Sequence, residues 1–203
     1  MNPNIRQMGF TLTEMMMTVV ILGVLMGVAA PSMRAVAQNS RITATHNELT
    51  GALQLARSEA VKRRTNVSIC ARATDTSCGE DWRNGWLVFT DGGATPGTVD
   101  AGEEVLAVVQ SVAPGIRVAN LAKLAAGSGG IAARHFVRFS GRGSSNWQGG
   151  GTFVLCDPRG ENSLSALNIV VSGDIRSARK SAGTVTSVFG TAAACPGTTA
   201  VSS

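Results

Sequence analysis

The chain has 203 residues and a formal net charge of +5 at pH 7. This length suits one ordinary domain with an appendage and leaves little room for two domains with separate cores. Its 24 glycines and an aromatic share of 4 % argue against a tightly packed helical bundle and favour a body of strands and turns.

The first predicted element is an apolar run over 10–30, which contains a single charge, Glu14. As a transmembrane helix this run is about 31 Å long, close to the roughly 30 Å hydrocarbon core of a bilayer. A secretory signal peptide is the alternative, but its apolar region is shorter and ends at a small-residue cleavage site, which the residues before Pro31 do not provide. The positive charge of Arg6 assigns the preceding segment to the cytoplasm and the rest of the chain to the other side of the membrane.

The stretch GFTLTE, followed by the apolar run, resembles the processing site of the type IV pilin superfamily. The resemblance implies that a prepilin peptidase cuts after Gly9, that the new N-terminal residue Phe10 is N-methylated, and that the apolar segment is kept. Thr13 stands where isoleucine or valine is usual, and Pro31 matches a position where pilin helices commonly kink. On this basis the chain begins with a leader peptide over 1–9.

Glu14 needs a physical explanation, because one carboxylate at membrane depth costs about 2.5 to 3.5 kcal/mol. If cleavage makes Phe10 the first residue, the positive amine of Phe10 in a neighbouring copy can pair with Glu14. Such a pair would set the axial register of subunits in a filament. Glu14 and Pro31 are therefore the predicted assembly residues.

Beyond residue 30 the pattern becomes amphipathic and predicts a continued helix over 31–64. Apolar positions recur at spacings of three, four or seven residues, namely Ile42, Leu49, Leu53, Ala56 and Ala60. The segment ELTGALQLARSEAVKRR resembles the helix end of the FimT, FimU and GspH group of minor pilins and pseudopilins. Its basic end suits the negative pole of the helix macrodipole, and a ligand site is the alternative.

Past residue 66 the chain breaks into short runs with strand character, separated by clusters of glycine, proline and aspartate. The predicted strands are 67–71, 86–90, 105–110, 115–119, 136–139, 152–156, 167–171 and 185–189. The phrases WRNGWLVFTD, GEEVL, FVRFSGRG and FVLCDPRG also resemble the globular domain of the same group. We therefore expect an α+β fold of the type IV pilin kind, in which a long N-terminal helix, transmembrane and then amphipathic, packs on a mainly antiparallel β domain over 65–203.

The four cysteines allow three pairings, and their spacing is not of the zinc-binding type. A domain translocated into an oxidising periplasm keeps its disulfides. We predict the pair Cys70–Cys78, which closes a small loop after the first strand, and the pair Cys156–Cys195, which ties the C-terminal tail to the sheet. Free buried thiols are the alternative.

No catalytic constellation is found in the sequence. His46 lies in the amphipathic helix and His135 opens a strand, each without an evident nucleophile or metal partner. The glycine-rich GRGSSNWQGGG has neither Walker nor dinucleotide-binding spacing and is interpreted as a hairpin loop. One loop contains four acidic residues that offer oxygen ligands for calcium, namely Asp91, Asp100, Glu103 and Glu104. Their order does not match that of an EF-hand. We predict no enzyme activity, no cofactor and no metal.

DNA is the alternative ligand, because a positive domain can neutralise phosphates. The candidate contacts are basic residues of the C-terminal half, Arg142, Arg159, Arg176, Arg179 and Lys180. FimT-type pilins that capture DNA carry a G-R-x-R phrase in their last strands. Here GDIRSARK has Gly173 and Arg176, but Asp174 in place of the first arginine. An acid repels phosphate, so this departure disfavours DNA uptake.

The sequence as a whole predicts a minor pilin of the FimU kind, a non-catalytic subunit of the tip or priming complex needed for pilus assembly and twitching. Expected partners are other minor pilins, the major pilin, the inner-membrane assembly machinery and the prepilin peptidase. We expect a single-pass inner-membrane protein of a Gram-negative bacterium, with a periplasmic domain, that reaches the cell surface in the pilus. The alternatives are a FimT-like DNA-binding pilin for natural transformation and a GspH-like pseudopilin of type II secretion.

Overall fold

The computed structural model of the protein describes the following parts of the chain: 9–123, 131–178, 180–181 and 183–195. Helix α1 (Leu12–Arg63) begins after Thr11 and ends where Arg64 adopts a left-handed φ of 53°. The N–H of Thr65 donates to the carbonyl of Ala60 at 3.3 Å, which satisfies one of the last helical acceptors. The helix therefore ends where the sequence predicts.

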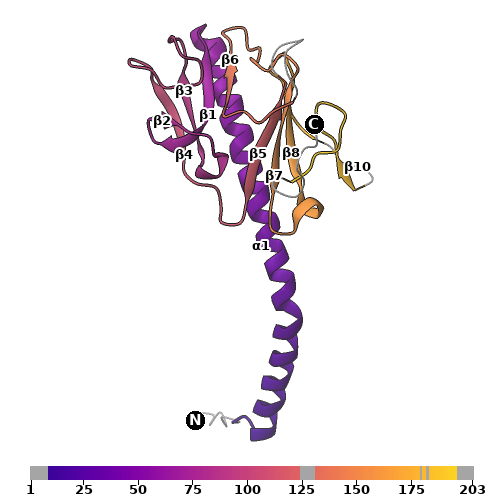
Figure 1. The fold of residues 1–203 in the computed structure, drawn as a ribbon. Coiled ribbons are helices and arrows are strands. Elements are labelled where there is room, and N and C mark those ends of the chain that lie inside the picture. The colour runs from indigo at the N-terminus through magenta and orange to yellow at the C-terminus, as the bar shows by residue number, and fades with distance from the viewer. Residues whose placement is uncertain (1–8, 124–130, 179, 182, 196–203) are drawn as a thin grey trace, which may run out of the picture. The chain divides into compact units, whose positions relative to one another are not determined.

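Two main antiparallel sheets follow α1 (Figure 1). The first has the order β2-β1-β3-β4, with β6 paired to β1, and its strands are β1 (Val67–Thr74), β2 (Ser77–Cys78), β3 (Trp86–Thr90), β4 (Val105–Val109) and β6 (Phe136–Phe139). The second has the order β5-β7-β8-β9, and its strands are β5 (Arg117–Ala122), β7 (Gly151–Cys156), β8 (Ser165–Ile169) and β9 (Ile175–Ser177). The short elements are β10 (Lys180–Ser181), which pairs with β11 (Thr184–Val185), and the 3-10 helices η1 (Trp82–Asn84) and η2 (Gly160–Ser163). The predicted α+β fold with antiparallel sheet is confirmed.

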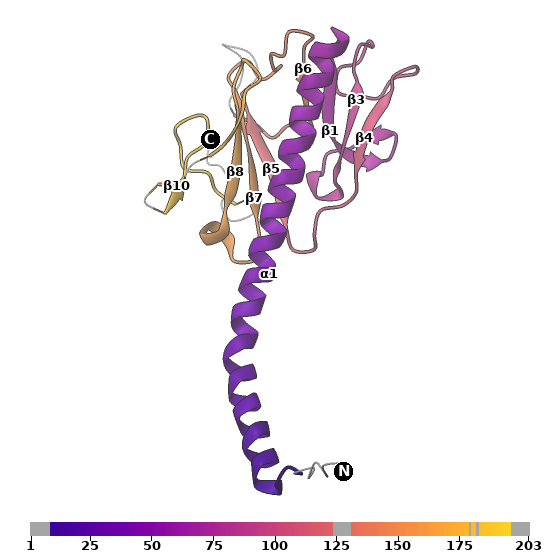
Figure 2. The same ribbon diagram turned by 180° about the vertical axis from the view of Figure 1, so that it is seen from behind.

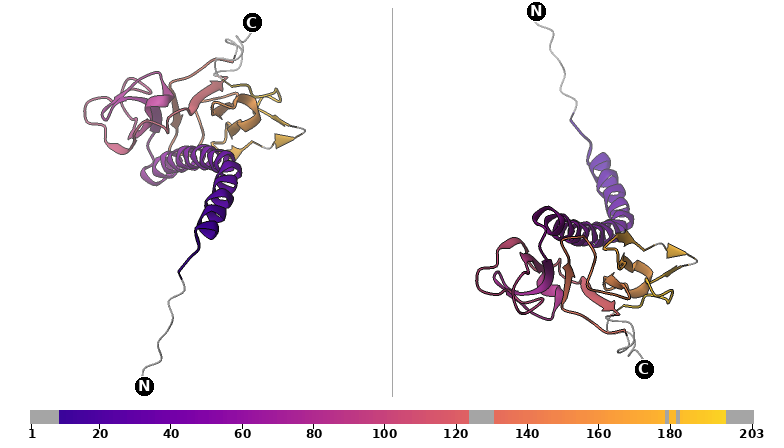
Figure 3. Two further views of the ribbon diagram at one scale, coloured as in Figure 1. Left: turned by 90° about the horizontal axis from the view of Figure 1, so that it is seen from below. Right: turned by 90° about the horizontal axis from the view of Figure 1, so that it is seen from above.

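By contact density the chain forms two compact units, one up to Ser40 and one from Arg41 onward. The second unit contains the last turns of α1 and both sheets, and these turns lie on one side of the two sheets (Figure 2). The same arrangement is seen along the vertical axis of the molecule (Figure 3). Part of the predicted amphipathic helix therefore belongs to the β-rich unit.

The main core of this second unit lies between α1 and the two sheets. The buried helix positions are Ile42, Thr45, Leu49, Ala52, Leu53, Ala56 and Ala60, which include all five predicted apolar positions. They share one hydrophobic cluster with side chains of both sheets, including Ile69, Val88, Phe153 and Leu167. A helix this rich in alanine and leucine on one face can approach both sheets closely, which explains why one helix suffices for two sheets.

Three predicted strands differ from the observed ones. The strand predicted at 115–119 is observed two residues later as β5, and the strand predicted at 167–171 is observed two residues earlier as β8. The chain turns after β8 because the N–H of Gly173, at a φ of 77°, donates to the carbonyl of Val170. The predicted strand 185–189 is cut short in the same way, because Ser187 and Thr191 close a turn.

The interpretation of GRGSSNWQGGG as a hairpin loop is wrong. This segment leaves β6 in the first sheet and enters β7 in the second sheet, so it connects strands that are not paired. The physical reason is Trp147, which is fully buried in the main core and donates its indole N–H to the carbonyl of Phe136 at 3.2 Å. Burying this large side chain draws the segment between the sheets.

Candidate functional site: the N-terminal segment and surface clusters

The first residues of α1 form a capping box. The backbone N–H and the hydroxyl of Thr11 both donate to Oε2 of Glu14 at 3.0 Å, and the N–H of Glu14 donates to the Thr11 hydroxyl at 3.3 Å. These contacts satisfy donors that the start of a helix leaves without partners. The spacing T-x-x-E is the usual signature of this cap, so the role of Thr11 and Glu14 in it could have been predicted from the sequence.

The predicted processing site precedes this cap. Gly9 and Phe10 lie outside the helix, and both are exposed. Among the described residues, and apart from its neighbours in the chain, no atom lies within 4 Å of the position that a Cβ on Gly9 would take. A protease needs an accessible, non-helical substrate, so the backbone between Gly9 and Phe10 meets that requirement.

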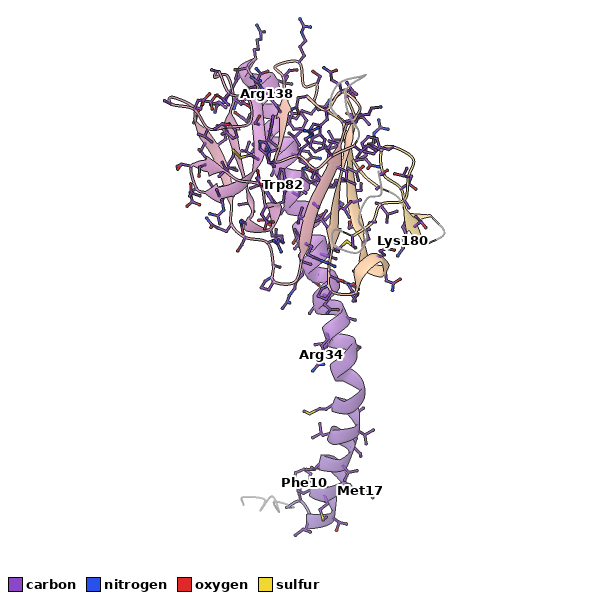
Figure 4. The ribbon with its side chains drawn as sticks, in the orientation of Figure 1. Phe10, Met17, Arg34, Trp82, Arg138 and Lys180 are labelled. Atoms are coloured by element: carbon purple, nitrogen blue, oxygen red, sulfur yellow. A yellow bond between two sulfur atoms is a disulfide. The ribbon has the colours of Figure 1, made fainter. Side chains whose placement is uncertain are left out.

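The helix beyond the cap is apolar, and no described residue of its own unit covers it. Each large apolar side chain described between Phe10 and Met26 exposes more than half of its surface. Phe10 and Met17 project away from the helix axis (Figure 4). By length and composition α1 can cross a membrane, and its backbone stays helical through Pro31. An apolar surface of this extent needs lipid or other helices around it.

Both cysteine pairs are bonded in the structure. Cys70 is linked to Cys78 at a sequence separation of 8, and Cys156 to Cys195 at a separation of 39. These are the two pairings expected from the sequence. Cys156 and Cys195 lie in a small hydrophobic cluster with Val185, which attaches the C-terminal segment to β7.

The predicted DNA contacts occupy different local environments. The guanidinium of Arg159 contacts the carboxylate of Asp157, with Nε at 2.8 Å. Lys180 is the first residue of β10 (Figure 4), and its ammonium group donates to the carbonyl of Asn162 at 3.0 Å. Arg179 lies outside the described residues. Arg159 and Lys180 therefore each donate to an acceptor within the protein itself.

Asp174, which replaces the first arginine of the G-R-x-R phrase, joins three segments of the protein. Arg57 of α1 contacts Asp174 at 3.0 Å and also donates to the carbonyls of Gly143 and Ser172 at 3.2 Å each. Arg176 contacts the second oxygen of Asp174 at 3.0 Å. Hydrogen bonds from Arg176 and then from Arg57 lower the pKa of Asp174. Asp174 is thus a structural acceptor that Arg57 and Arg176 share.

Arg142 is the exception among the predicted DNA contacts. It lines two open clefts of about 630 and 800 Å³ at the end of α1, and Arg64 lines the larger one. Within the described part of the chain, the side chain of neither arginine has a hydrogen-bond or ion-pair partner. Among the predicted DNA residues that the structure describes, Arg142 is thus the one whose side chain has no partner, and it lies beside Arg64, which was not predicted.

His46 contacts two hydroxyl groups that the sequence did not reveal. Its Nε2 lies 3.0 Å from Oγ of Ser177, and its Nδ1 lies 2.8 Å from Oγ of Ser165. Burial lowers the pKa of His46. Because serines occupy both ring nitrogens, no carboxylate orients this imidazole, and the three residues do not form a nucleophilic triad. The contacts connect α1 to β8 and β9.

The acidic loop directs its side chains to backbone N–H groups. Oδ2 of Asp100 accepts from Thr95 at 3.0 Å, and Glu103 accepts from Gly93 and Asp100 at 2.8 Å each. Glu104 instead contacts Arg63 at 2.5 Å. Within the described ranges, no three acidic, histidine or cysteine side chains converge on a position for a metal ion.

Asp91, the remaining acid of the calcium candidates, is fully buried at the end of β3. It accepts hydrogen bonds from the hydroxyl of Ser68 and from the N–H of Gly97, and its carboxylate lies 3.5 Å from Nε of Arg138. Arg138 also donates to the Asp91 carbonyl at 2.8 Å, near the end of β6 (Figure 4). This network links β1, β3 and β6.

Two family models match the chain. The model described as Type II transport protein GspH matches residues 45–174, and the model of the prokaryotic N-terminal methylation motif matches residues 6–30. The first match covers more than half of the chain, including both sheets up to the turn before β9. The chain belongs to the GspH family. Within this GspH-family chain, the second match contains Gly9, Phe10 and Glu14.

Two solved structures resemble this GspH-family chain. Both are crystal structures of the type IV minor pilin FimU from Pseudomonas aeruginosa strain PAO1. The form in space group P21 is 24 % identical, covers 70 % of this chain and 91 % of FimU, and has a TM-score of 0.52. The form in space group P65 is 23 % identical, covers 68 % and 92 %, and has a TM-score of 0.50. A search of curated protein sequences found no match. The GspH-family chain therefore has the fold of a type IV minor pilin.

Proposed function

We propose that this chain is a minor pilin of a type IV pilus, a non-catalytic subunit of the tip or priming complex needed for pilus assembly and twitching. The observation that supports this most is the combination of an N-terminal methylation motif over 6–30 with a GspH domain over 45–174 in one chain. The exposed apolar surface of α1 suits a subunit that is stored in a membrane and then packs among neighbouring helices.

In this proposal a prepilin peptidase removes 1–9 at the exposed Gly9, and Phe10 is then N-methylated. The 10–30 segment anchors the chain in the inner membrane of a Gram-negative bacterium, and the domain that follows lies in the periplasm, where its disulfides persist. During assembly, Glu14 pairs with the Phe10 amine of a neighbouring pilin. Both Thr11 hydrogen bonds use Oε2 of Glu14, so Oε1 can accept from that amine without loss of the cap.

A pseudopilin of type II secretion is the second candidate function, because the matching family model carries that description. A single deletion strain distinguishes the possibilities when it is scored for four properties: surface pili, twitching, natural transformation and secretion of folded exoproteins. Loss of pili and twitching supports the pilus role. Normal pili with failed secretion would assign the chain to the secretion system, and normal pili with failed transformation would assign it to DNA uptake.

Processing is tested separately by mass spectrometry of the mature chain. We expect the mature N-terminus to be Phe10 carrying one added methyl group. Gly9→Val is expected to leave the precursor uncut, because the new side chain blocks the scissile position. Gly23→Val, at a helix glycine that also has open space around it, is the matched control and should be processed normally.

A further inference from the structure

A pocket of about 350 Å³ lies where β5, at the edge of the second sheet, faces the segment that leads into β6. Its inner wall includes Trp82, Val118 and Asn120, and the exposed residues Glu80 and His135 lie at its rim. Trp82 lies between the two sheets (Figure 4). The N-terminal segment and the surface clusters described above do not include this pocket, so its polar groups need a separate explanation.

Asn120 is the unusual residue of the inner wall. Along β5 the buried positions alternate as Val118, Asn120 and Ala122, so a polar amide takes a core-facing position and is only 2 % exposed. Its Oδ1 accepts the backbone N–H of Arg134 at 2.7 Å, which fixes the orientation of the amide. Its Nδ2 then has no acceptor within the described residues.

Arg134 contributes a second donor without an acceptor. Both polar groups of its backbone are hydrogen-bonded, because its N–H donates to Asn120 and its carbonyl accepts the indole N–H of Trp82 at 2.9 Å. Its Nε is buried and has no hydrogen-bond partner in the described parts of the chain. Asp81, which also lines the pocket, contacts Arg83 at 2.7 Å and so is not the partner of Arg134.

Asn120 and Arg134, which both line this pocket, therefore each have one buried donor without an acceptor among the described residues. Buried donors without partners cost free energy, and a guanidinium prefers a carboxylate because the hydrogen bond is charge-assisted. We propose that this pocket binds a carboxylate group between Asn120 and Arg134. A volume of about 350 Å³ is at the lower end of small-ligand sites, so it suits one acidic side chain, one chain terminus or one small organic acid.

The test is NMR titration of the full chain in detergent micelles, observing the side-chain signals of Asn120 Nδ2 and Arg134 Nε. The probes are N-acetylglutamate α-amide for an acidic side chain, N-acetylglycine for a chain terminus and acetate for a small acid, at matched ionic strength. N-acetylglutamine α-amide is the neutral control. We expect saturable shifts of both signals in the millimolar range with at least one carboxylate, and the strongest probe identifies the source.

Variants decide whether these two residues are responsible. Arg134→Gln should weaken binding about tenfold, because it removes the charge-assisted hydrogen bond. Arg72→Gln, which removes a guanidinium that does not line the pocket and is paired with Asp75, should change the affinity less than twofold as judged from the same titration. Asn120→Asp keeps the acceptor for the Arg134 N–H but replaces the donor, so binding should be lost while the backbone spectrum is retained.

Three results would overturn the proposal. The first is the absence of saturable shifts with all carboxylates, which would mean that water alone satisfies the donors. The second is an equal response to the neutral glutamine probe. The third is unchanged affinity in Arg134→Gln, a substitution at a half-buried side chain that leaves the backbone contacts intact. None of these results depends on pilus assembly.

Discussion

At the residue scale, Glu14 has one observed role and one proposed role, and the two use different oxygens. Its Oε2 completes the capping box with Thr11. Within the described residues its Oε1 accepts no hydrogen bond and is available to a donor from another subunit. A carboxylate near the start of a membrane helix is therefore explained in the single chain by the cap and in the proposed filament by an ion pair.

The two tasks of Glu14 can be separated by substitution. Glu14→Gln keeps an oxygen that can cap Thr11 but removes the charge, and we expect it, like Glu14→Ala, to insert into the membrane and fail to enter the pilus. Thr11→Val removes the hydroxyl contacts but keeps the charge, so incorporation should be reduced much less. Carbonate extraction measures insertion, and immunoblotting of sheared pili measures incorporation. Normal incorporation of Glu14→Gln would contradict the ion pair.

Asp157 makes the folded state sensitive to acid. Burial alone would raise its pKa, but hydrogen bonds from Arg159 and Ser163 outweigh this effect and lower the pKa below its usual value. The folded state then binds fewer protons than the unfolded state. The stabilisation is complete above the unfolded pKa, 3.8 in the reference state, and is lost as the pH falls through the lower folded pKa.

We expect Asp157→Asn to reduce the free energy of unfolding by about 1 to 3 kcal/mol at neutral pH. The difference between the variant and the unmodified chain should shrink below about pH 4. Urea titrations followed by tryptophan fluorescence measure this, because all three tryptophans are buried in the β-rich unit. Asp75→Asn, at a surface ion pair with Arg72, is the control and should stay within about 0.5 kcal/mol at every pH. A difference that does not change with pH would contradict the proposed linkage.

Some residue roles were accessible from the sequence and others were not. The T-x-x-E cap involves neighbours on one helical turn, so the spacing alone contains the information. The contact of Arg57 with Asp174 joins positions 117 residues apart, and the contact of His46 with Ser165 joins positions 119 residues apart. No local pattern encodes such pairs, because they arise only when α1 packs against the loops and strands of the second sheet.

At the scale of elements, periodicity located α1 and the buried strands reliably. The helix face was correct because apolar spacing at three and four residues has one geometric interpretation. Some predicted strand ends differ from the observed ones, because turns such as the one closed by Gly173 depend on the conformation of a single residue. The segment around Trp147 shows most clearly what composition does not predict. Its many glycines indicate a loop, but they do not indicate which strands the loop connects.

The two disulfides should stabilise the β-rich unit to different degrees. By loop entropy, replacing both cysteines of the Cys70–Cys78 pair with serine should cost about 2.5 kcal/mol, and replacing Cys156 and Cys195 about 4 kcal/mol. The second pair closes the longer loop and holds the C-terminal segment on β7. Urea unfolding of the full chain in micelles gives both values. A thiol titration without reductant should detect no free thiol, and reactive thiols would contradict the pairing and the periplasmic location.

At the scale of the whole molecule, net charge alone overstates the surface available to a polyanion. Removal of 1–9 leaves 17 basic residues against 13 acidic ones. Arg159 and Arg176 are paired to carboxylates, and Lys180 is bound to a carbonyl, whereas Arg142 and Arg64 remain accessible. An ion-paired arginine contributes little counterion release when DNA binds.

We expect the full chain in micelles to bind duplex DNA only at low salt and without a strong site. Arg176→Ala should change this binding less than Arg142→Ala does, because the Arg176 guanidinium is already paired with Asp174. Arg142→Ala should reduce the slope of log affinity against log salt by about one. Fluorescence anisotropy at several salt concentrations measures both. Tight binding at physiological salt that is lost in Arg176→Ala would support the DNA-uptake alternative.

The sequence by itself determined the family, the N-terminal segment and the helix face, because motifs and apolar periodicity are local properties of the chain. It also restricted the cysteines to few pairings and suggested the two that are formed. Only the tertiary structure decided that two sheets share one helix, that Asp174 holds Arg57, and that Asn120 and Arg134 face one pocket. Such features depend on segments far apart in the chain meeting in space, and their energies come from packing and desolvation that no short stretch of residues contains.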